Sequence, residues 1–269
     1  MAISAKDVMA LRQRTGLGMM DCKKALEETN GDMEAAVEML RAKLKGKMDE
    51  RTDRAAAEGR IAIAIEDDRS AVAIAELNTE TDFTARNEKF GEATRKVAQI
   101  ALDADAEGAI DSSPEMKDII DNVRITTGEN SSFRRAHKLA GGYCGSYLHH
   151  NEQVGVIVKF SGQVDDEVAT GICQHITAHV PTPAGVGPDD IPSELMDKQR
   201  ESAREEAAES GKPDNIIEKM IEGKLRKFVE ENALLHQKYV KDPEGKKQVK
   251  DVLPKGVTIE EFVRYRVGG

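Results

Sequence analysis

Apolar positions near the N-terminus recur with the period of an α-helix, and three short helices are expected over residues 1–55. Ser4 and Asp7 have the spacing of a capping box, and Asp32, which follows an Asn-Gly pair, is the expected cap of the third helix. The residues expected to pack in this bundle are Val8, Ala10, Leu11, Met20, Cys22, Ala25, Leu26, Val37, Leu40 and Leu44. From Lys43 to Arg54 the periodicity is lost and charge dominates, which predicts a solvated linker.

The pattern then changes from a helical period to alternation, which is typical of strands. Residues 60–65 and 71–77 predict one hairpin, and residues 139–148 with 154–160 predict a second. Helices are expected over residues 90–101, 116–123 and 165–180. Residues 259–267 alternate again and are expected to rejoin the sheet of the second hairpin. The two units have a similar layout, which suggests an internal α+β duplication.

Prolines and glycines between residues 181 and 192 predict a rigid connector without helix. Residues 193–210 and 214–231 then give two charged helical segments separated by a Gly-Lys-Pro break, which is the pattern of an αα-hairpin. The expected seam of this hairpin consists of Leu195, Ile216, Ile217, Met220, Ile221, Leu225 and Phe228.

Together these patterns predict an α+β fold with an N-terminal three-helix domain, two α+β core subdomains with antiparallel sheets, and an inserted helical hairpin. The expected division is residues 1–55 for the helical domain with its linker, 56–138 for core subdomain N, 139–188 with 232–269 for core subdomain C, and 189–231 for the hairpin.

Composition narrows the classes of function. The net charge of −10 disfavours a direct nucleic-acid partner, because phosphate binding needs a basic surface. Cys22, Cys144 and Cys173 are far apart and form no Cys-x-x-Cys pair, which fits reduced cytosolic thiols better than disulfides or a zinc site. No segment is apolar enough for a signal region or a membrane span, so a cytoplasmic protein without membrane contact is expected. The sequence also lacks a phosphate-binding loop, and neither cofactor nor metal is expected.

Residues 78–84, Asn-Thr-Glu-Thr-Asp-Phe-Thr, lie where a strand ends and a helix begins. Phe83 is unusual in so polar a turn, because an exposed Phe ring forfeits about 1.5–3 kcal/mol of burial. One interpretation is that Phe83 folds back as a core plug, with Asp82 as an N-cap. The other is that the ring is a wedge for a pocket in a partner, with a carboxylate beside it. The pattern alone leaves both interpretations open.

Several motifs, in order along nearly the whole chain, resemble those of the elongation factor Ts family. The segment Thr-Gly-Leu-Gly-Met-Met-Asp-Cys-Lys-Lys-Ala-Leu at 15–26, followed by Asn-Gly-Asp at 30–32, is similar to the signature of the family's first domain. Residues 79–83 are similar to the family's Thr-Asp-Phe element. The further matching segments are residues 128–130 with 134–135, 145–149, 175–179 and 210–213.

The resemblance implies a non-enzymatic guanine-nucleotide exchange factor that acts during translation elongation on the GTPase elongation factor Tu, in its GDP-bound and nucleotide-free forms. In the family, the Thr-Asp-Phe element disturbs the magnesium site of the GTPase, which implies partner contacts for Thr81, Asp82, Phe83 and Thr84. Phe83 would enter between two helices of the partner, and Asp82 would compete with the network around the ion.

The family's first domain resembles a ubiquitin-associated fold and grips the nucleotide-binding domain of Tu. The resemblance therefore implies partner contacts for Arg12, Met19, Met20 and Lys23, and a pair of flexible methionines suits an adaptable contact. The alternative for these positions is one core methionine among solvated charges.

The second core subdomain is implied to hold the carboxy-terminal barrel domain of Tu through Leu148 and His149; the alternative is a surface histidine without consequence. Phe133 lies in a contact region whose sequence is less specific. The helical hairpin is a coiled-coil dimerisation or accessory module in the family, which implies a homodimer or a 2:2 complex with Tu. Plain surface decoration is the other interpretation of the hairpin.

His175 and His179 have the spacing of a zinc pair on one helix, but Ile176 stands where a metalloprotease motif needs Glu. A structural helix is therefore expected there. Two other classes of protein are kept as alternatives. One is a metal hydrolase that uses these two histidines with His149 and His150, and the other is a ubiquitin-associated-type scaffold without exchange activity.

The sequence departs from the family pattern at its end. Relatives from enteric bacteria continue past the last strand into a helix that contacts the GTPase, whereas this sequence stops at Val267-Gly268-Gly269. We therefore expect that contact to be absent, with the affinity for Tu lower or redistributed toward the first domain.

Overall fold

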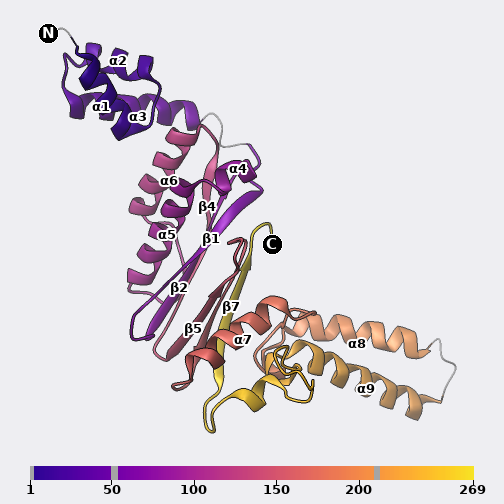
Figure 1. The fold of residues 1–269 in the computed structure, drawn as a ribbon. Helices are drawn as coiled ribbons and strands as arrows, with labels where there is room; N and C mark the ends of the chain where they lie inside the picture. The colour runs from indigo at the N-terminus through magenta and orange to yellow at the C-terminus, as the bar shows by residue number, and fades with distance from the viewer. Residues whose placement is uncertain (1–2, 50–53, 209–212) are drawn as a thin grey trace.

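The computed structural model describes residues 3–49, 54–208 and 213–269 (Figure 1). Its α-helices are α1 (Ala5–Thr15), α2 (Met19–Glu28), α3 (Met33–Asp49), α4 (Asp82–Ala85), α5 (Glu88–Asp103), α6 (Pro114–Thr127), α7 (Asp166–Ala178), α8 (Ser193–Ala208) and α9 (Asp214–Asn232). Short 3-10 helices are η1 (Pro188–Asp190), η2 (Leu234–His236) and η3 (Val249–Val252), so the expectation of a connector without helix is wrong at η1. Its strands are β1 (Glu58–Ile65), β2 (Ala71–Thr79), β3 (Gly108–Ile110), β4 (Ser131–Ala140), β5 (Tyr143–Leu148), β6 (Val154–Phe160) and β7 (Ile259–Arg266). The predicted α+β class is confirmed.

The N-terminal helices form the predicted small bundle. The Ser4 hydroxyl accepts a hydrogen bond from the Asp7 amide at 3.2 Å, and the Asp7 carboxylate accepts one from the Ser4 amide at 3.3 Å, so the capping box is present. The Asp32 carboxylate caps α3 by accepting from the Glu34 amide at 3.0 Å. The buried core consists of Val8, Leu11, Cys22, Ala25, Leu26, Ala36, Val37 and Leu40.

Three expectations for this bundle need correction or fall outside the structure. Ala10 and Met20 were expected to pack, but both are exposed, because they lie on the outer faces of α1 and α2. The linker expected from Lys43 is helical as far as Asp49, since α3 continues through these charged residues. Its remainder at 50–53 and the side chain of Leu44 lie outside the described residues.

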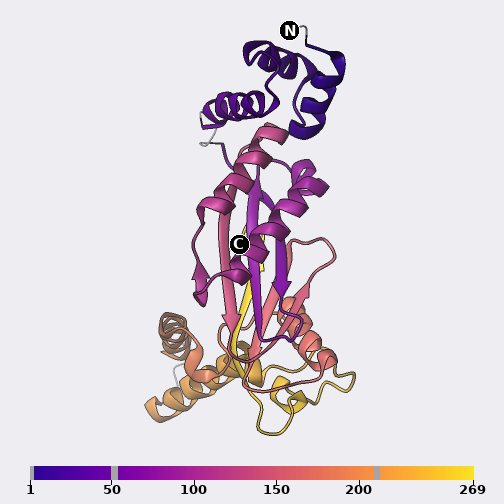
Figure 2. The same cartoon turned by 90° about the vertical axis from the view of Figure 1, so that its left-hand side faces the viewer.

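The first sheet has the strand order β1-β2-β4-β3 with antiparallel pairs. Its face toward α5 and α6 carries small side chains, including Ala73 and Ala75, which let the helices approach closely, and Phe90 of α5 fills the space between them. Figure 2 shows α5 and α6 lying across this face. The helices expected over 90–101 and 116–123 are confirmed, each with a few more residues at both ends.

The second sheet has the order β5-β6-β7, and the predicted return of the last strand to the second hairpin is confirmed. The strand expected over 139–148 is wrong in its bounds, because it spans two strands. Leu139 and Ala140 complete β4, where Leu139 pairs with Val72 of the first sheet, and β5 begins only at Tyr143. The expected domain division stays a prediction.

The two sheets pack face to face and form the centre of the molecule. Ile61 and Ile74 of the first sheet pack with Ile157 and Tyr265 of the second in one buried cluster. The outer face of the second sheet is covered by α7 and by the segment after α9, around Phe160. The order of layers is therefore helices, sheet, sheet and helix, and it fixes the ends of the strands relative to one another.

Helices α8 and α9 form the predicted hairpin, which projects from the second sheet (Figure 1). The seam differs from the expectation. Leu195 and Ile216 are exposed, whereas the other expected residues, Ile217, Met220, Ile221, Leu225 and Phe228, are half-buried. On α8, Ala203 and Ala207 are buried. The Gly-Lys part of the expected break lies outside the described residues. Within the described ranges, no helix is long and apolar enough to cross a membrane.

Candidate functional site

Most of the element at residues 81–84 lies in α4, a single helical turn that follows the capping residue Thr81 and precedes Asn87, the cap of α5. The Thr81 hydroxyl accepts from the Thr84 amide at 3.3 Å, so Thr81 is the N-cap, and the interpretation that gave Asp82 that role is wrong. Asp82 instead occupies the first turn, where a carboxylate is favoured, and pairs with Arg86 at 3.2 Å. The Asn87 side chain then caps α5 by accepting from the Lys89 amide. The turn is therefore locally specified on both sides.

Phe83 points away from the core at the middle of this turn. Its side chain is 84% exposed, while its neighbours Thr84 and Ala85 are buried. The interpretation of Phe83 as a core plug is therefore wrong for this structure. An exposed aromatic ring beside a carboxylate, on a turn whose backbone is fixed, is a surface suited to a partner's apolar pocket.

The turn between β5 and β6 carries the second group of predicted residues. Leu148 and His149 are both half-buried. Leu148 ends β5 and packs against the cluster between the sheets, and His149 begins the turn that follows. The His149 Nδ1 atom lies 3.1 Å from the Tyr147 hydroxyl, and its ring lies 4.3 Å from that of His150. The His149 ring is thus held by neighbours within the hairpin.

This hairpin turn is also tied to the first sheet. The Ile61 amide of β1 donates to the Glu152 carbonyl at 2.8 Å, and the Glu152 carboxylate forms an ion pair with Arg60. Burial lowers the pKa of the Arg60 guanidinium from its ordinary value, although the group has a carboxylate partner. The backbone bond and the ion pair hold the β5–β6 turn against β1.

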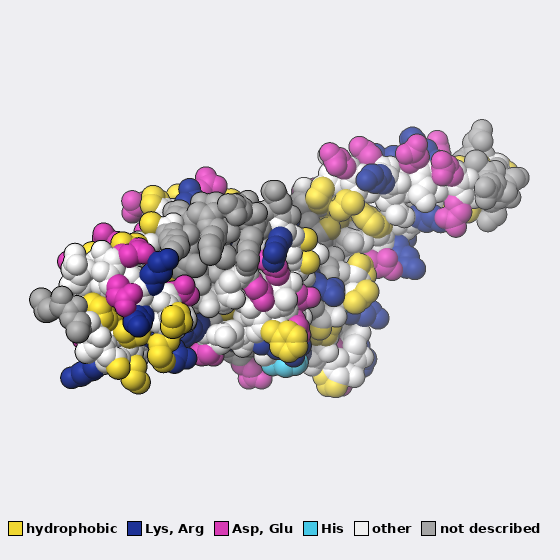
Figure 3. Space-filling model, turned by 90° about the horizontal axis from the view of Figure 1, so that it is seen from above, with side chains coloured by type: hydrophobic (Ala, Val, Ile, Leu, Met, Phe, Trp, Pro, Cys, Tyr) yellow, Lys and Arg dark blue, Asp and Glu magenta, His cyan; other side chains and the backbone are white. Residues whose placement is uncertain are grey.

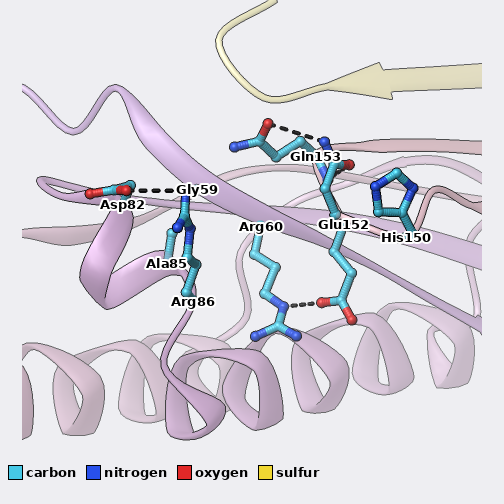
Figure 4. Close-up of a pocket in the computed structure, with 9 residues that line it drawn as sticks. Gly59, Arg60, Asp82, Ala85, Arg86, His150, Glu152 and Gln153 are labelled. Atoms are coloured by element: carbon cyan, nitrogen blue, oxygen red, sulfur yellow. Dashed lines mark hydrogen bonds and ion pairs between the residues drawn. The ribbon is translucent and has the colours of Figure 1, made fainter.

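A hollow of about 350 Å³ separates α4 from the β5–β6 turn (Figure 4). Asp82, Ala85 and Arg86 line one side, and His150 and Glu152 line the other. Of the predicted contact residues, Asp82 lines this hollow, whereas Leu148 and His149 do not. His149 lines a separate hollow together with Val154 and Arg264.

The predicted contact residues of the N-terminal domain also lie at the surface. Arg12, Met19, Met20 and Lys23 are all exposed, and the Lys23 ammonium lies 3.7 Å from the Glu27 carboxylate. The alternative of one core methionine among solvated charges is wrong for this structure. Met9 is also exposed, one turn before Arg12 on α1, and the spacing of three residues places the two on the same face of the helix. Figure 3 shows hydrophobic side chains interspersed with charges over these helices.

The N-terminal domain and α4 lie toward the same end of the core (Figure 1). Helix α3 contacts α6, and Arg14 and Leu17 line a hollow with Asn122 and Thr126 of α6. The exposed methionines and Phe83 are thus carried by parts of the chain that meet at one end of the first sheet's helices.

His175 is a structural residue of α7, as predicted. It is fully buried; its Nε2 atom lies 2.9 Å from the Gln237 side-chain oxygen, and its Nδ1 accepts from the Val240 amide at 3.2 Å. Both ring nitrogens of the neutral imidazole thus have a hydrogen-bond partner. The His179 Nδ1 atom lies 2.9 Å from the Pro181 carbonyl oxygen. Across the described ranges, no group of three or more His, Cys, Asp or Glu side chains could hold a metal ion.

Stability is expected to depend on pH through His175. Burial lowers the pKa of this imidazole to about 4, while the unfolded chain titrates near its ordinary value of 6.5. Between these values the unfolded state binds more protons, so stability is full above the unfolded pKa and falls as the pH is lowered through the window. Urea unfolding should show a loss of about 2 kcal/mol between about pH 7 and pH 5. The His175→Gln variant should show a correspondingly smaller slope, and an identical slope would contradict the assignment.

The cysteines offer no reactive nucleophile in this structure. Cys22, Cys144 and Cys173 are free and buried. Burial raises the pKa of the Cys144 thiol to about 11 and also raises that of Cys173, so both stay protonated at neutral pH. The thiols therefore serve packing.

Phe133 and Arg135 are half-buried and pack at the edge of the core. Phe133 packs partly buried against the cluster beneath α5 and α6. Arg135 pairs with the fully buried Glu76 at 2.7 Å and lies over the Tyr265 ring at 4.2 Å, joining the two sheets.

Comparisons with known proteins extend over the whole chain. Residues 80–269 match the family model described as elongation factor TS. The chain is 43% identical over 281 residues to elongation factor Ts of Thioalkalivibrio sulfidiphilus, with 100% of this chain and 93% of that protein covered. It is 39% identical over 278 residues to that of Halorhodospira halophila, with 100% and 93% covered. It is 42% identical over 294 residues to that of Nitratiruptor sp., with 100% and 94% covered.

Proposed function

The chain belongs to the elongation factor Ts family of non-enzymatic nucleotide exchange factors, and on that premise we propose that it binds GDP-bound elongation factor Tu and releases the nucleotide by disturbing its magnesium site. The residues assigned to this step are Thr81, Asp82, Phe83 and Thr84. The observation that carries the proposal is the exposure of Phe83 on a capped turn, with Asp82 beside it.

The exposed ring supplies a driving force for insertion. Moving a Phe side chain from water into an apolar pocket is worth about 1.5–3 kcal/mol. Because the backbone of α4 is already ordered by its caps, little conformational entropy is lost when the ring enters a partner. Phe83 therefore acts as the wedge.

Asp82 acts on the charge around the nucleotide. A bound magnesium ion is the largest local positive charge in a GTPase site and compensates the phosphates of GDP. A carboxylate brought beside that site competes for the groups that hold the ion, and loss of the ion leaves the phosphate charge uncompensated. The affinity for GDP then falls.

Exchange follows from the reciprocity of binding. If the factor weakens GDP binding by some ratio, GDP weakens binding of the factor by the same ratio. A coupling of about 4 kcal/mol corresponds to roughly a thousandfold change in affinity. A new nucleotide that binds Tu can then displace the factor, which is released chemically unchanged.

Two further surfaces hold Tu while the wedge acts. We assign Arg12, Met19, Met20 and Lys23 to the nucleotide-binding domain of Tu, and Leu148 and His149 to its carboxy-terminal barrel domain. Each contact raises the effective concentration of the others, so individually weak surfaces retain the partner. The exposed methionines support this role, since flexible thioethers adapt to irregular surfaces.

The helical hairpin is the candidate surface for self-association. Its exposed Leu195 and Ile216 lie outside the alanine seam and are available to a second copy. Sedimentation of the chain alone and with Tu separates a homodimer or a 2:2 complex from a 1:1 complex.

A displacement assay tests the proposed function. Tu loaded with fluorescent GDP is mixed with excess unlabelled GDP, with and without this chain, and the rate constant of GDP release is followed by stopped flow. The chain should accelerate release by about a thousandfold at saturation. A chain that binds Tu but leaves the rate constant unchanged is a scaffold and contradicts the proposal.

A further inference from the structure

Glu129 lies directly behind the α4 turn, although it comes from a different part of the chain. Gly128 ends α6 in the left-handed conformation with φ of 74°, which turns the chain out of the helix at Glu129. The side chain of Glu129 is half-buried between the end of α6 and the start of α4. Glu129 belongs to the matching segment 128–130, but the sequence pattern assigns it no role.

The Glu129 carboxylate accepts hydrogen bonds from both sides of the α4 N-cap. One oxygen accepts from the Thr81 hydroxyl at 2.7 Å. The other accepts from the Thr81 amide and from the Thr79 hydroxyl, each at 3.1 Å. One side chain thus joins the last residue of β2 and the cap of α4 to the end of α6.

Neighbouring residues extend the same connection. The Asn130 amide donates to the Glu80 carboxylate at 2.6 Å, and the Ser131 hydroxyl donates to that of Thr79 at 3.2 Å. Residues 129–131 therefore lie alongside residues 79–81 and join them largely through side chains. Within this set, Glu129 is the residue that reaches the N-cap itself.

The turn needs such support because its own interactions are few. A single helical turn is marginal in water, since fixing its backbone costs more than its hydrogen bonds return. Thr84 and Ala85 anchor the turn in the core, but the exposed Phe83 contributes no packing that would hold it outward. A loosened turn would let the ring bury itself against apolar surface of its own chain.

The carboxylate is ionised under ordinary conditions. Burial acts to raise the pKa of Glu129, but the hydrogen bonds from Thr81, Thr84 and Thr79 outweigh it and lower the pKa below its usual value. Hydrogen bonds to a charged acceptor are stronger than those between neutral groups, which suits a residue that must hold a turn in place.

We propose that Glu129 is a positioning residue for nucleotide exchange: it locks Thr81 to the end of α6 and so holds Phe83 in the outward orientation. This inference rests on the proposed function of Phe83. It assigns to Glu129 no contact with the partner, so its loss should affect the step that Phe83 performs more than the binding of Tu.

The test is the Glu129→Gln variant, which keeps the shape of the side chain but places an amide donor against the Thr81 and Thr79 donors. Glu115→Gln is the matched control, because Glu115 is an exposed carboxylate in the first turn of α6, whereas Glu129 follows the last turn of that helix. Hydrogen exchange on the free protein reports the lock directly. The amides of Ala85 and Arg86 donate to the carbonyls of Thr81 and Asp82. Their protection factors against exchange should fall about tenfold in Glu129→Gln and stay unchanged in Glu115→Gln.

The functional readout is the rate constant of GDP release from Tu at saturating factor, together with the concentration that gives half-saturation. Glu129→Gln should lower the saturating rate constant about tenfold, equivalent to about 1.4 kcal/mol, and leave half-saturation within about twofold. On a Phe83→Ala background the same change should have no further effect, since the residue it positions is gone. If Glu129→Gln does not fold, Thr79→Val, which removes one of the three donors, carries the same measurements with a smaller expected effect.

Unchanged protection of the α4 amides, an equal loss of rate on the Phe83→Ala background, or a loss confined to half-saturation would each overturn the proposal. A natural chain that does not accelerate GDP release at all would refute the proposed function instead. In that case the amide protection still decides whether Glu129 holds α4.

Discussion

The Phe83→Ala variant is expected to release GDP from Tu about ten- to a hundredfold more slowly than the natural chain at saturating concentration. The side chain is 84% exposed in the free protein, so the burial that it gains on entering a partner is nearly complete. That burial is worth about 1.5–3 kcal/mol, and each 1.4 kcal/mol changes a rate about tenfold. Stopped-flow displacement of fluorescent GDP measures the effect.

The stability of the Phe83→Ala variant provides the first control. Because the ring contributes little to packing, the free energy of unfolding should change by less than about 0.5 kcal/mol. Val240→Ala removes another exposed apolar side chain, away from α4, and should leave both stability and exchange unchanged. A Phe83→Ala variant that exchanges at the natural rate would exclude the wedge.

The Gly155→Val variant is expected to destabilise the core by about 2 kcal/mol, which lowers the melting temperature by about 4–8 °C. Gly155 lies in β6 on the face that packs against the first sheet. A Cβ atom there would lie 2.9 Å from the Cγ2 atom of Ile61 and 3.0 Å from the Cδ1 atom of Ile74, both fully buried. Valine is favoured over glycine in a strand, so the loss of stability would report the contact between the sheets rather than local propensity. Thermal unfolding followed by circular dichroism measures it.

Gly223→Ala is the matched control for this substitution. Gly223 lies within α9, and among the described residues an added Cβ would meet no atom within 4 Å beyond the backbone of its own helix. Alanine should therefore stabilise this helix by about 0.5–1 kcal/mol. If Gly155→Val were as stable as the natural chain, the close packing of the sheets at this point would be wrong.

Elements with a strong local pattern were predictable from the sequence. The first hairpin follows from its apolar, β-branched runs around a polar turn, and α7 and the return of β7 follow from their periodicity. The sequence pattern predicts a linker from Lys43, because the last turns of α3 lack an apolar stripe, whereas this helix continues to Asp49. Lysine, leucine and methionine, which make up most of residues 43–49, are strong helix formers, and their propensity continues the helix without such a stripe.

Strand β4 escaped prediction because its polar residues find partners far away in the chain. Arg135 pairs with Glu76, the His137 ring contacts Glu261, and the Lys138 ammonium donates to the Ala104 carbonyl. A segment with these charges resembles a loop until its tertiary partners are known. The same reason displaced the expected start of the second hairpin.

Some residues of the candidate site could be recognised from the sequence, and others could not. Phe83 could be recognised from the sequence, since a large aromatic residue in a polar turn is anomalous. Glu129 could not, because its role depends on hydrogen bonds across about 50 positions of sequence that only the fold brings together. The joining of the β5–β6 turn to β1 by Arg60 and Glu152 was hidden for the same reason.

The pairing of β6 with β7 has a consequence for the order in which the chain acquires its structure. Phe160 pairs with Ile259, and the whole helical hairpin lies between them in the sequence. During synthesis from the N-terminus, β6 must leave the ribosome with one edge unpaired and wait while the hairpin is made. The first sheet can form early, whereas the second is completed only when its last strand emerges, so this edge is where premature association between nascent chains would begin.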